Sequence, residues 1–437
     1  MGFYNPNLIQ IPLEKFSYTN QSDEIDAVEG VRCSKWREIA DDDYIKTFDN
    51  KCSTLYEAFR LGAGKSHGGP CLGSRPSVFS PYSWITYDDV VTRAKNFGSG
   101  LLNMGLSSGV HTMVGVYCRN CPEWIIAEQG LYSYSMVNVP LYDGLGPNAR
   151  AFVIKECEMR LIVAYDEINV KNILDSAHTC LKVIVTVEDI NPRLVEEADG
   201  LGIKIVRFKD VELSGSESPS EVVPPSPSTI ATICFSRLAA VGAKLLGRPK
   251  GVILSHENMV SATSACIVQL GMYAPRRTDV LFSYLPLAHN LERCCELAVF
   301  MAGGAVGFYS GNIKFADADM KALRPTILPA VPRFLNRVYD SCVASVNKVI
   351  IDIIIKSEIL FLFLDQLDQA IVQPCSHQED RGTAQGHCQE DVHLGRLHLQ
   401  VCQVQGRWQC EAGHLWVSPT PEQCGHLPPL QPGLCHC

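Results

Sequence analysis

Short apolar runs alternate with helix-like segments through the first half of the chain, and this alternation constrains the fold more than any other feature. Strand-like runs recur at residues 111–118, 159–165, 182–187 and 203–208. Helix-like segments lie between them, such as residues 122–136, which Pro122 opens, and residues 167–177. Such short apolar strands, separated by helices, are typical of parallel strands that are buried on both faces. The sequence therefore predicts an α/β fold with doubly wound, mostly parallel sheets.

Two more helices are predicted before the first of these strands. Residues 52–61 place apolar side chains on one face of a helix. Residues 84–106 begin like a strand and continue as an amphipathic helix. Asp88 or Asp89 is expected to cap that helix, and Gly105 is expected to end it.

A segment rich in Ser, Pro and Glu, residues 214–229, interrupts the alternation. Its composition predicts a surface linker with no helix or central strand. A strand follows directly, and a helix is predicted from His256 onward with Ser255 as its N-cap. We therefore expect an N-terminal extension at 1–50, an α/β subdomain at 51–213, a linker at 214–228, a second α/β subdomain at 229–348, and an atypical, disordered tail at 349–437.

Composition excludes several classes of protein. The chain has 437 residues, of which 46% are hydrophobic, so it can bury a large core. Its formal net charge of −9 argues against a nucleic-acid binder, which relies on neutralising phosphates. The 19 cysteines lack the spacing of a disulfide framework, and the N-terminus has no apolar stretch of the kind that follows the charged start of a secretory signal. We expect buried free thiols in a reducing compartment.

The tail differs from the rest of the chain. Residues 349–367 are long and apolar enough for a membrane anchor, but they hold Asp352, Lys356 and Glu358, each of which costs about 2.5–3.5 kcal/mol near the centre of a bilayer. Beyond them the chain has no Lys, Tyr, Phe or Met and is rich in Cys and His. A zinc module is a further reading, although no C-x₂-C pair with a matching His pair is present. Both readings stay open.

Residues 232–251 hold the most informative local pattern. Thr232 to Phe235 read as a buried strand, and the segment ends in Gly247, Arg248, Pro249, Lys250 and Gly251. A loop of Gly, Ser and Thr after a buried strand can bind phosphates through backbone N–H groups and hydroxyls. Here Ser236 supplies one hydroxyl, but residues 238–241 are apolar where donors are needed. Arg237 and Lys244 could compensate as cations.

Five blocks together resemble the long-chain acyl-CoA synthetases, which are AMP-forming adenylate ligases. The blocks are GPCLGSRP (69–76), NCPEWIIAEQGLYSYSMVNVPLYDGLG (120–146), RPKGVILSHENMVSATSAC (248–266), YLPLAHNLER (284–293) and RPTILPAVPRFLNRVYD (324–340). They follow the family's order and cover about residues 50–347. The resemblance implies activation of a long-chain fatty acid by ATP, with Mg²⁺, to an acyl-adenylate and then transfer to coenzyme A.

The resemblance also implies roles for particular residues. Ser236, Gly247, Lys250 and Gly251 would form what remains of the phosphate loop, with Lys250 countering phosphate charge, and His289 and Glu292 would line the pocket as catalytic residues. The alternative for His289 is a simple helix cap. Glu123, Trp124, Tyr142 and Asp143 are expected to maintain the fold, and Arg333 and Arg337 to form structural or surface pairs. No residue is assigned to a metal.

The family's later motifs do not follow residue 347, so we expect an incomplete N-terminal body of such a ligase. Two functions stay open: a long-chain-fatty-acid–CoA ligase, impaired by its altered loop, or a non-catalytic homologue that binds fatty acid or a partner. The resemblance places the protein at the cytosolic face of the endoplasmic reticulum or the mitochondrial outer membrane, and peripheral membrane association is an open expectation.

Overall fold

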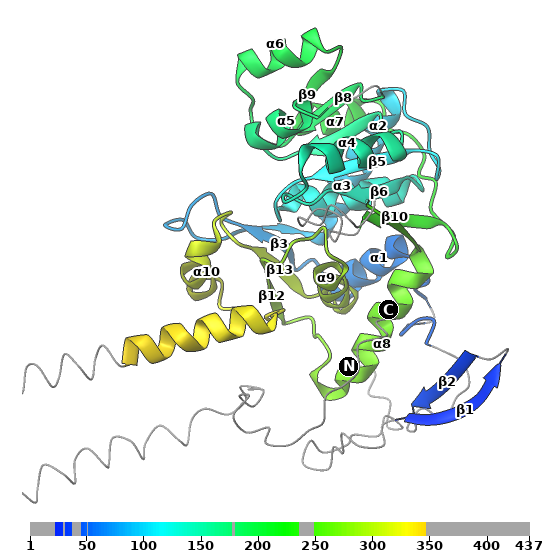
Figure 1. The fold of residues 1–437 in the computed structure, drawn as a ribbon, viewed down its shortest axis with the longest axis vertical. Helices are drawn as coiled ribbons and strands as arrows, with labels where there is room; N and C mark the ends of the chain where they lie inside the picture. Colours follow the sequence, from blue (N-terminus) through cyan, green and yellow to red (C-terminus); the bar gives the residue numbers. More distant parts are fainter. Residues whose placement is uncertain are drawn as a thin grey trace, which may run out of the picture. The chain divides into compact units, whose positions relative to one another are not determined.

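A seven-stranded sheet is the larger of the two main sheets in the computed structural model, which describes residues 22–28, 31–36, 45–49, 51–176, 180–235 and 249–346. Its strand order is β11-β10-β6-β5-β7-β8-β9, and only β11 is antiparallel to its neighbour (Figure 1). The strands are β5 (Met113–Tyr117), β6 (Val137–Pro140), β7 (Leu161–Ala164), β8 (Val183–Thr186), β9 (Lys204–Arg207), β10 (Ile230–Phe235) and β11 (Gly251–Ser255). The prediction of a doubly wound, mostly parallel sheet is confirmed.

Both faces of this sheet are buried, because successive strand residues join different clusters. In β7, Leu161 and Val163 belong to one cluster, and Ile162 and Ala164 belong to another. One face packs against α2 (Tyr87–Asn103), α3 (Pro122–Ser133) and α7 (Phe208–Glu217). The other face packs against α4 (Pro147–Glu156), α5 (Glu167–Leu174) and α6 (Pro192–Gly200). This two-sided burial explains why the strands read as continuous apolar runs.

A four-stranded sheet has the order β12-β13-β3-β4, with β12, β13 and β3 parallel and β4 antiparallel. Its strands are β3 (Pro70–Ser74), β4 (Ser83–Thr86), β12 (Val280–Ser283) and β13 (Ala305–Phe308). The helices α1 (Leu55–Ser66), α8 (His256–Leu270) and α9 (Asn290–Ala302) pack beside one another, and α10 (Ala316–Leu323) follows β13. Leu72 and Val306 of this sheet share a core cluster with Val114 and Val116 of the large sheet, so the two sheets have one core.

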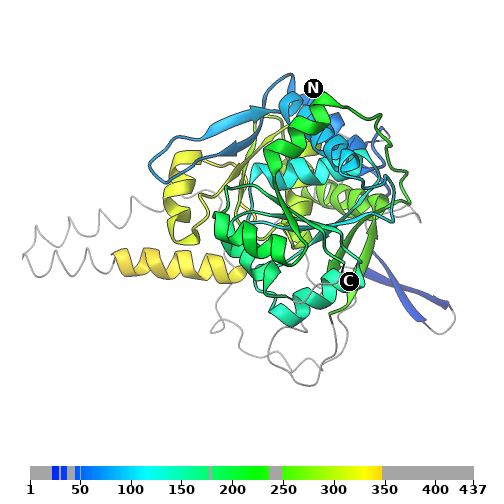
Figure 2. The ribbon, with the colours of Figure 1, turned by 90° about the horizontal axis from the view of Figure 1, so that it is seen from above.

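A hairpin, two short 3₁₀ helices and one further helix complete the description. Strands β1 (Ser22–Val28) and β2 (Val31–Trp36) form an antiparallel hairpin, and the short 3₁₀ helices are η3 (Gly271–Tyr273) and η4 (Ile313–Phe315). Residues 332–345 form a helix that extends away from the sheets in both views (Figures 1 and 2). The chain divides into two units, Met1–Ser345 and Val346–Cys437, and these elements belong to the first. No helix within the described ranges is both long and apolar enough to span a membrane; residues 349–367 lie outside those ranges.

Two local predictions are wrong. Helix α2 is capped by Thr86, whose side chain accepts a hydrogen bond from the Asp89 backbone N–H, while the Asp89 carboxylate accepts one from the Thr86 backbone N–H. Asp89 is thus the third helical residue and not the cap. Helix α7 continues to Glu217, so the first four residues of the Ser/Pro-rich segment are helical. The N-cap role of Ser255 and the opening of α3 by Pro122 are confirmed.

Helices α2 and α7 approach so closely that glycine is required on each. A Cβ at Gly100 would lie 2.0 Å from the carbonyl oxygen of Val211, and one at Gly215 would lie 1.8 Å from that of Asn96. Backbone atoms cannot move aside as the end of a side chain can. The packing of α2 against α7, and with it one face of the large sheet, therefore depends on these two glycines.

We predict that Gly100→Ala lowers the free energy of unfolding by about 1–3 kcal/mol, because the methyl group forces the helices apart. Gly64→Ala in α1 is the matched control, since a Cβ there meets no atom within 4 Å. The control should raise the free energy of unfolding by up to about 1 kcal/mol through helix propensity. Urea denaturation measures the free energy of unfolding of both variants. Equal changes in the two would show that the close approach of α2 and α7 does not require glycine at position 100.

A candidate active site at the strand ends

The antiparallel hairpin of β10 and β11 brings together the two ends of the altered loop. Phe235 and Gly251 are paired in register, so the chain leaves the sheet and returns to it at the same point. Lys250 lies at this return and is exposed. The predicted loop residues Ser236 and Gly247 lie outside the described residues, so their roles stay predictions.

The end of β10 contacts the start of α9. The thiol of Cys234 donates a hydrogen bond to Oδ1 of Asn290, with 3.2 Å between sulfur and oxygen. His289 precedes Asn290 and is the N-cap of α9, because its Nδ1 accepts a hydrogen bond from the Leu291 backbone N–H at 3.1 Å. Its imidazole is exposed. The loop hairpin and His289 therefore lie together, and His289 also has the capping role that was its alternative.

A buried arginine holds this junction in place. Arg293 of α9 is paired with Glu128 of α3 and donates to the Tyr132 hydroxyl at 2.9 Å. It also donates to the hydroxyl of Thr232 in β10 at 3.2 Å. Burial opposes the charge on Arg293, but Glu128 holds the pKa of the guanidinium well above its usual value. One side chain thus fixes α9 to both α3 and the strand that carries the loop.

A cavity of about 200 Å³ opens beside this junction. Its walls come from the segments that follow β5, β6, β12 and β13, and they comprise Cys118, Arg119, Asn120, Leu141, Tyr142, Asp143, Gly144, Tyr284, Pro286, Leu287, Ala288 and Tyr309. The chain reverses its direction of strand addition at β5, since β6 lies on one side of it and β7 on the other. Doubly wound sheets bind ligands at the carboxyl ends of the strands at such a reversal.

Asn120 joins the two sheets at this cavity. Its Nδ2 donates to Oγ of Ser283 at 2.8 Å and to the carbonyl of Leu285 at 2.7 Å, and its Oδ1 accepts from the Leu287 backbone N–H at 3.1 Å. Asn120, Ser283 and Leu287 are buried, and Leu285 is partly buried. Asn120 therefore sets the path of the segment after β12, which forms one cavity wall.

The side chain of Glu292, which is predicted to line the pocket, is completely buried. It is not among the described residues that line this cavity, so its pocket role stays a prediction. Oε1 accepts a hydrogen bond from the Tyr284 backbone N–H at 3.2 Å. Glu292 thus contacts the cavity only through the backbone that forms its wall.

Glu292 lies next to a second buried carboxyl, Glu296, one turn along α9. Neither oxygen of Glu296 nor Oε2 of Glu292 has a well-aligned hydrogen-bonding partner among the described residues. Burial, together with the neighbouring Glu296, raises the pKa of Glu292. Burial, with Glu128 close by, also raises the pKa of Glu296, and the Ser283 hydroxyl and Arg293 only partly offset this. At this buried position both carboxyls are therefore favoured in their protonated form.

A C-x-x-C spacing, Cys118 and Cys121, lies where β5 passes into α3, and sequence reasoning did not single it out. Both thiols are free and buried. Burial raises the pKa of each, and for Cys121 the nearby Glu123 carboxylate acts in the same direction. Thiols held in the neutral form are poor nucleophiles, so these cysteines act as apolar core residues.

The other residues identified from the sequence lie in the core, on the surface or at the cavity. Trp124 is buried in the main core, and Glu123 pairs with Arg93. Arg333 and Arg337 are exposed on the helix of residues 332–345. Tyr142 and Asp143 line the cavity, so maintaining the fold does not fully describe their position. The sequence signal that could have found them is their place directly after β6.

These strand ends define a doubly wound α/β protein with a cavity between its two sheets. A family model described as AMP-binding enzyme matches residues 72–351, which is more than half of the chain. The chain belongs to the AMP-binding enzyme family.

Curated relatives are similar over the same region. Long-chain-fatty-acid–CoA ligase 5 of Mus musculus is 39% identical over 303 residues, which cover 68% of this chain and 43% of the relative. Long-chain-fatty-acid–CoA ligase 6 of Rattus norvegicus is 38% identical over 343 residues, which cover 77% of this chain and 47% of the relative. The chain thus spans less than half the length of these relatives.

Solved structures show the same fold. The A domain of a carboxylic acid reductase from Segniliparus rugosus, bound to AMP and a carboxylic acid, has a TM-score of 0.56 at 14% identity, with 68% of this chain and 51% of that chain covered. An anthranilate CoA ligase bound to anthranoyl-AMP has a TM-score of 0.51 at 16% identity, with coverage of 63% and 49%.

We predict that Glu296→Gln flattens the pH dependence of stability. The folded state holds protons on the Glu pair above the ordinary pKa of Glu, about 4.3, where the unfolded state has lost them. Stability conferred by these protons is therefore present at low pH and falls as pH rises through the raised pKa values. Gln cannot ionise, so the variant should lose less stability between pH 5 and pH 9, by an amount on the order of 1–3 kcal/mol.

Urea denaturation at several pH values measures this difference. Glu217→Gln, at the exposed end of α7, is the control and should follow the wild-type curve. A variant at Glu296 that loses stability with pH as steeply as wild type would show that the pair does not hold protons.

Proposed function

We propose that this protein activates long-chain fatty acids at the junction of β10, α9 and the cavity. Membership of the AMP-binding enzyme family and similarity to long-chain-fatty-acid–CoA ligases support this proposal. The observation that carries it is the Cys234–Asn290 contact, which places the loop-bearing hairpin beside His289 and the cavity wall. The overall reaction converts ATP, a long-chain fatty acid and coenzyme A to acyl-CoA, AMP and pyrophosphate.

The reaction has two balanced steps. A carboxylate oxygen attacks the α-phosphorus of ATP, and the bond to pyrophosphate breaks, which gives the acyl-adenylate. The thiol of coenzyme A then attacks the acyl carbon, the bond to AMP breaks, and the thiol proton passes to solvent. Positioning and cationic groups lower such barriers more than a strong base does.

The described residues have distinct parts in this scheme. Lys250, exposed at the start of β11, supplies a cation at the loop, and Gly251 lets the strand return close to Ile233 and Phe235. His289 has Nδ1 engaged as an acceptor, so its Nε2 carries the proton and can donate to a substrate oxygen. The cavity is smaller than the roughly 300–1,000 Å³ that encloses a drug-sized ligand, so it takes only part of a substrate.

Within the described part of the chain, no group of three or more His, Cys, Asp or Glu side chains is placed to hold a metal ion such as Mg²⁺. ATP and coenzyme A enter the proposed reaction as substrates. The expectation of no nucleic-acid partner rests on the net charge of −9.

For location we propose the cytosolic face of the endoplasmic reticulum or the mitochondrial outer membrane, with peripheral association. The support is physical, since a long-chain fatty acid gains about 0.8 kcal/mol per methylene group buried in a bilayer and is therefore found at membranes.

A non-catalytic role is the second candidate. It is favoured by residues 238–241, which are apolar where a phosphate loop needs hydrogen-bond donors. In that case the cavity and α9 would bind fatty acid without turnover.

Pyrophosphate release separates the two. With ATP, Mg²⁺ and palmitate, we expect palmitate-dependent release, and Lys250→Ala should reduce its rate roughly 10²–10³-fold, because it removes charge stabilisation at the phosphates. Lys204→Ala, an exposed lysine of β9, is the control and should match wild type. Palmitate binding in calorimetry without any pyrophosphate release would reject the ligase and support the second candidate.

A further inference from the structure

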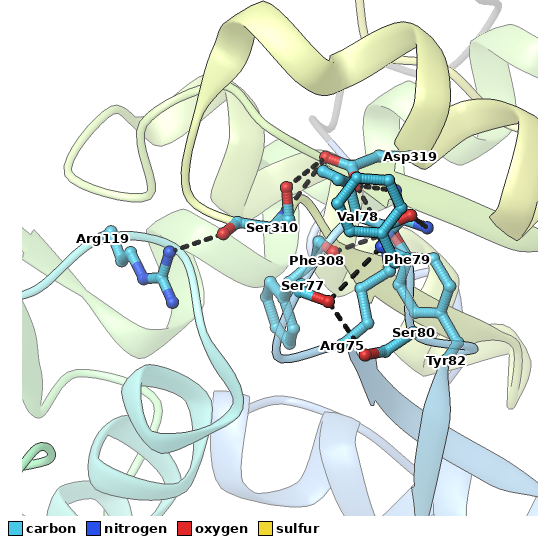
Figure 3. A network of polar contacts seen from close by, with 10 residues as sticks. All are labelled: Arg75, Ser77, Val78, Phe79, Ser80, Tyr82, Arg119, Phe308, Ser310 and Asp319. Carbon is cyan, nitrogen blue, oxygen red and sulfur yellow. Dashed lines mark hydrogen bonds and ion pairs between the residues drawn. The ribbon is translucent and has the colours of Figure 1, made fainter.

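A buried ion pair anchors the cavity wall that follows β13. Arg75 at the end of β3 pairs with Asp319 of α10, and their side chains are 2% and 0% exposed. Nε of Arg75 donates to Oδ1 of Asp319 at 2.7 Å, and a second nitrogen of Arg75 donates to the Val78 carbonyl at 3.0 Å (Figure 3). Oδ1 of Asp319 is thus committed to the arginine, which leaves Oδ2 for other donors.

Oδ2 of Asp319 fixes Ser310, the second residue after β13. It accepts from the Ser310 backbone N–H at 2.9 Å and from the Ser310 hydroxyl at 3.0 Å. With both groups held, the Ser310 carbonyl points toward the large sheet, where Nη1 of Arg119 donates to it at 2.9 Å (Figure 3). A chain of polar contacts therefore runs from α10 to the end of β5.

Gly311 keeps space for that arginine. Its φ of +98° is in the region that favours glycine. A Cβ at this position would lie only 1.3 Å from Nη1 of Arg119. Any side chain here must therefore displace the guanidinium, which can swing away because it is the end of a flexible side chain.

Arg119 itself is held by uncharged groups. Its guanidinium lies 4.2 Å from the centre of the Tyr165 ring and donates to the Tyr165 hydroxyl and to the Ser310 carbonyl. Its Nε is buried with no hydrogen-bonding partner among the described residues. Asp143 is the carboxyl among the residues that line the cavity, and burial raises the pKa of that group, which weakens it as a counter-ion. The cavity wall thus presents a positive charge with which no carboxylate among the described residues pairs directly.

We propose that Asp319, Ser310 and Gly311 are positioning residues that hold the Arg119 guanidinium on the cavity wall to receive an anionic group of a substrate. Arg119 makes the contact, and the other three act through it. The anionic group is a carboxylate or a phosphate, supplied by the fatty acid, ATP or coenzyme A. The inference rests on the proposed function for the identity of these substrates and goes beyond it in assigning Arg119 and its supports.

The test compares Gly311→Ala with Gly109→Ala. Gly109 has a similar φ of +106°, but a Cβ there meets no atom within 4 Å, so the control shares the backbone strain and leaves Arg119 in place. Calorimetry measures the affinity of each variant for palmitate, ATP and coenzyme A separately, without requiring turnover. We expect Gly311→Ala to weaken the affinity for one of the three by at least about tenfold, the effect of losing about 1.4 kcal/mol, with the others unchanged.

Substitutions at Arg119 give the second arm. Arg119→Gln should weaken the same ligand, and Arg119→Lys should recover part of that loss because it keeps the charge. A merely structural role would move thermal stability and all three affinities together. Equal affinities in Gly311→Ala and Gly109→Ala overturn this inference alone, whereas a wild-type chain that binds none of the three ligands overturns the proposed function as well.

Discussion

The buried guanidinium of Arg293 is the interaction on which the arrangement of the site depends. It joins α9 to Glu128 and Tyr132 of α3 and to Thr232 of β10. A buried pair that loses one partner leaves the other charge uncompensated, so this contact specifies one packing of the helices rather than several. Because His289 is the N-cap of α9 and β10 ends where the altered loop begins, the same contact sets the start of α9 beside the end of β10.

Charge inside the molecule is unevenly balanced around this arginine. Three carboxyls, Glu128, Glu292 and Glu296, share the region with one guanidinium. Of the three, Glu128 is paired directly with Arg293. Burial raises the pKa of both Glu292 and Glu296. A second buried pair, Arg75 with Asp319, performs a comparable task for the segment after β13. The first pair fixes α9 against β10 and the second fixes the segment after β13, and ligands of doubly wound proteins bind at such strand ends.

The repeating pattern of the chain predicted the large sheet well, since its strands are apolar on both faces and are separated by helices. The four-stranded sheet was not predicted, because β3 pairs with β13, which lies far away in the chain, and β4 joins the sheet through β3. The residues predicted from motifs differ in where the structure places them. His289 lies at the junction, but the interior position of Glu292 could not be inferred from spacing. Asn120 is the first residue of a motif block and Arg119 directly precedes it, yet their function follows only from long-range contacts with Ser283 and Ser310.

We propose that the strand ends, the start of α9 and the loop hairpin form one site for an acyl-adenylate. Hydrogen exchange of the backbone amides, measured with and without a stable palmitoyl-adenylate mimic, reports on this site. We expect slower exchange in residues 232–235 and 284–293 together, with little change in β8 and β9. Protection of neither segment, or protection confined to β8 and β9, would contradict it.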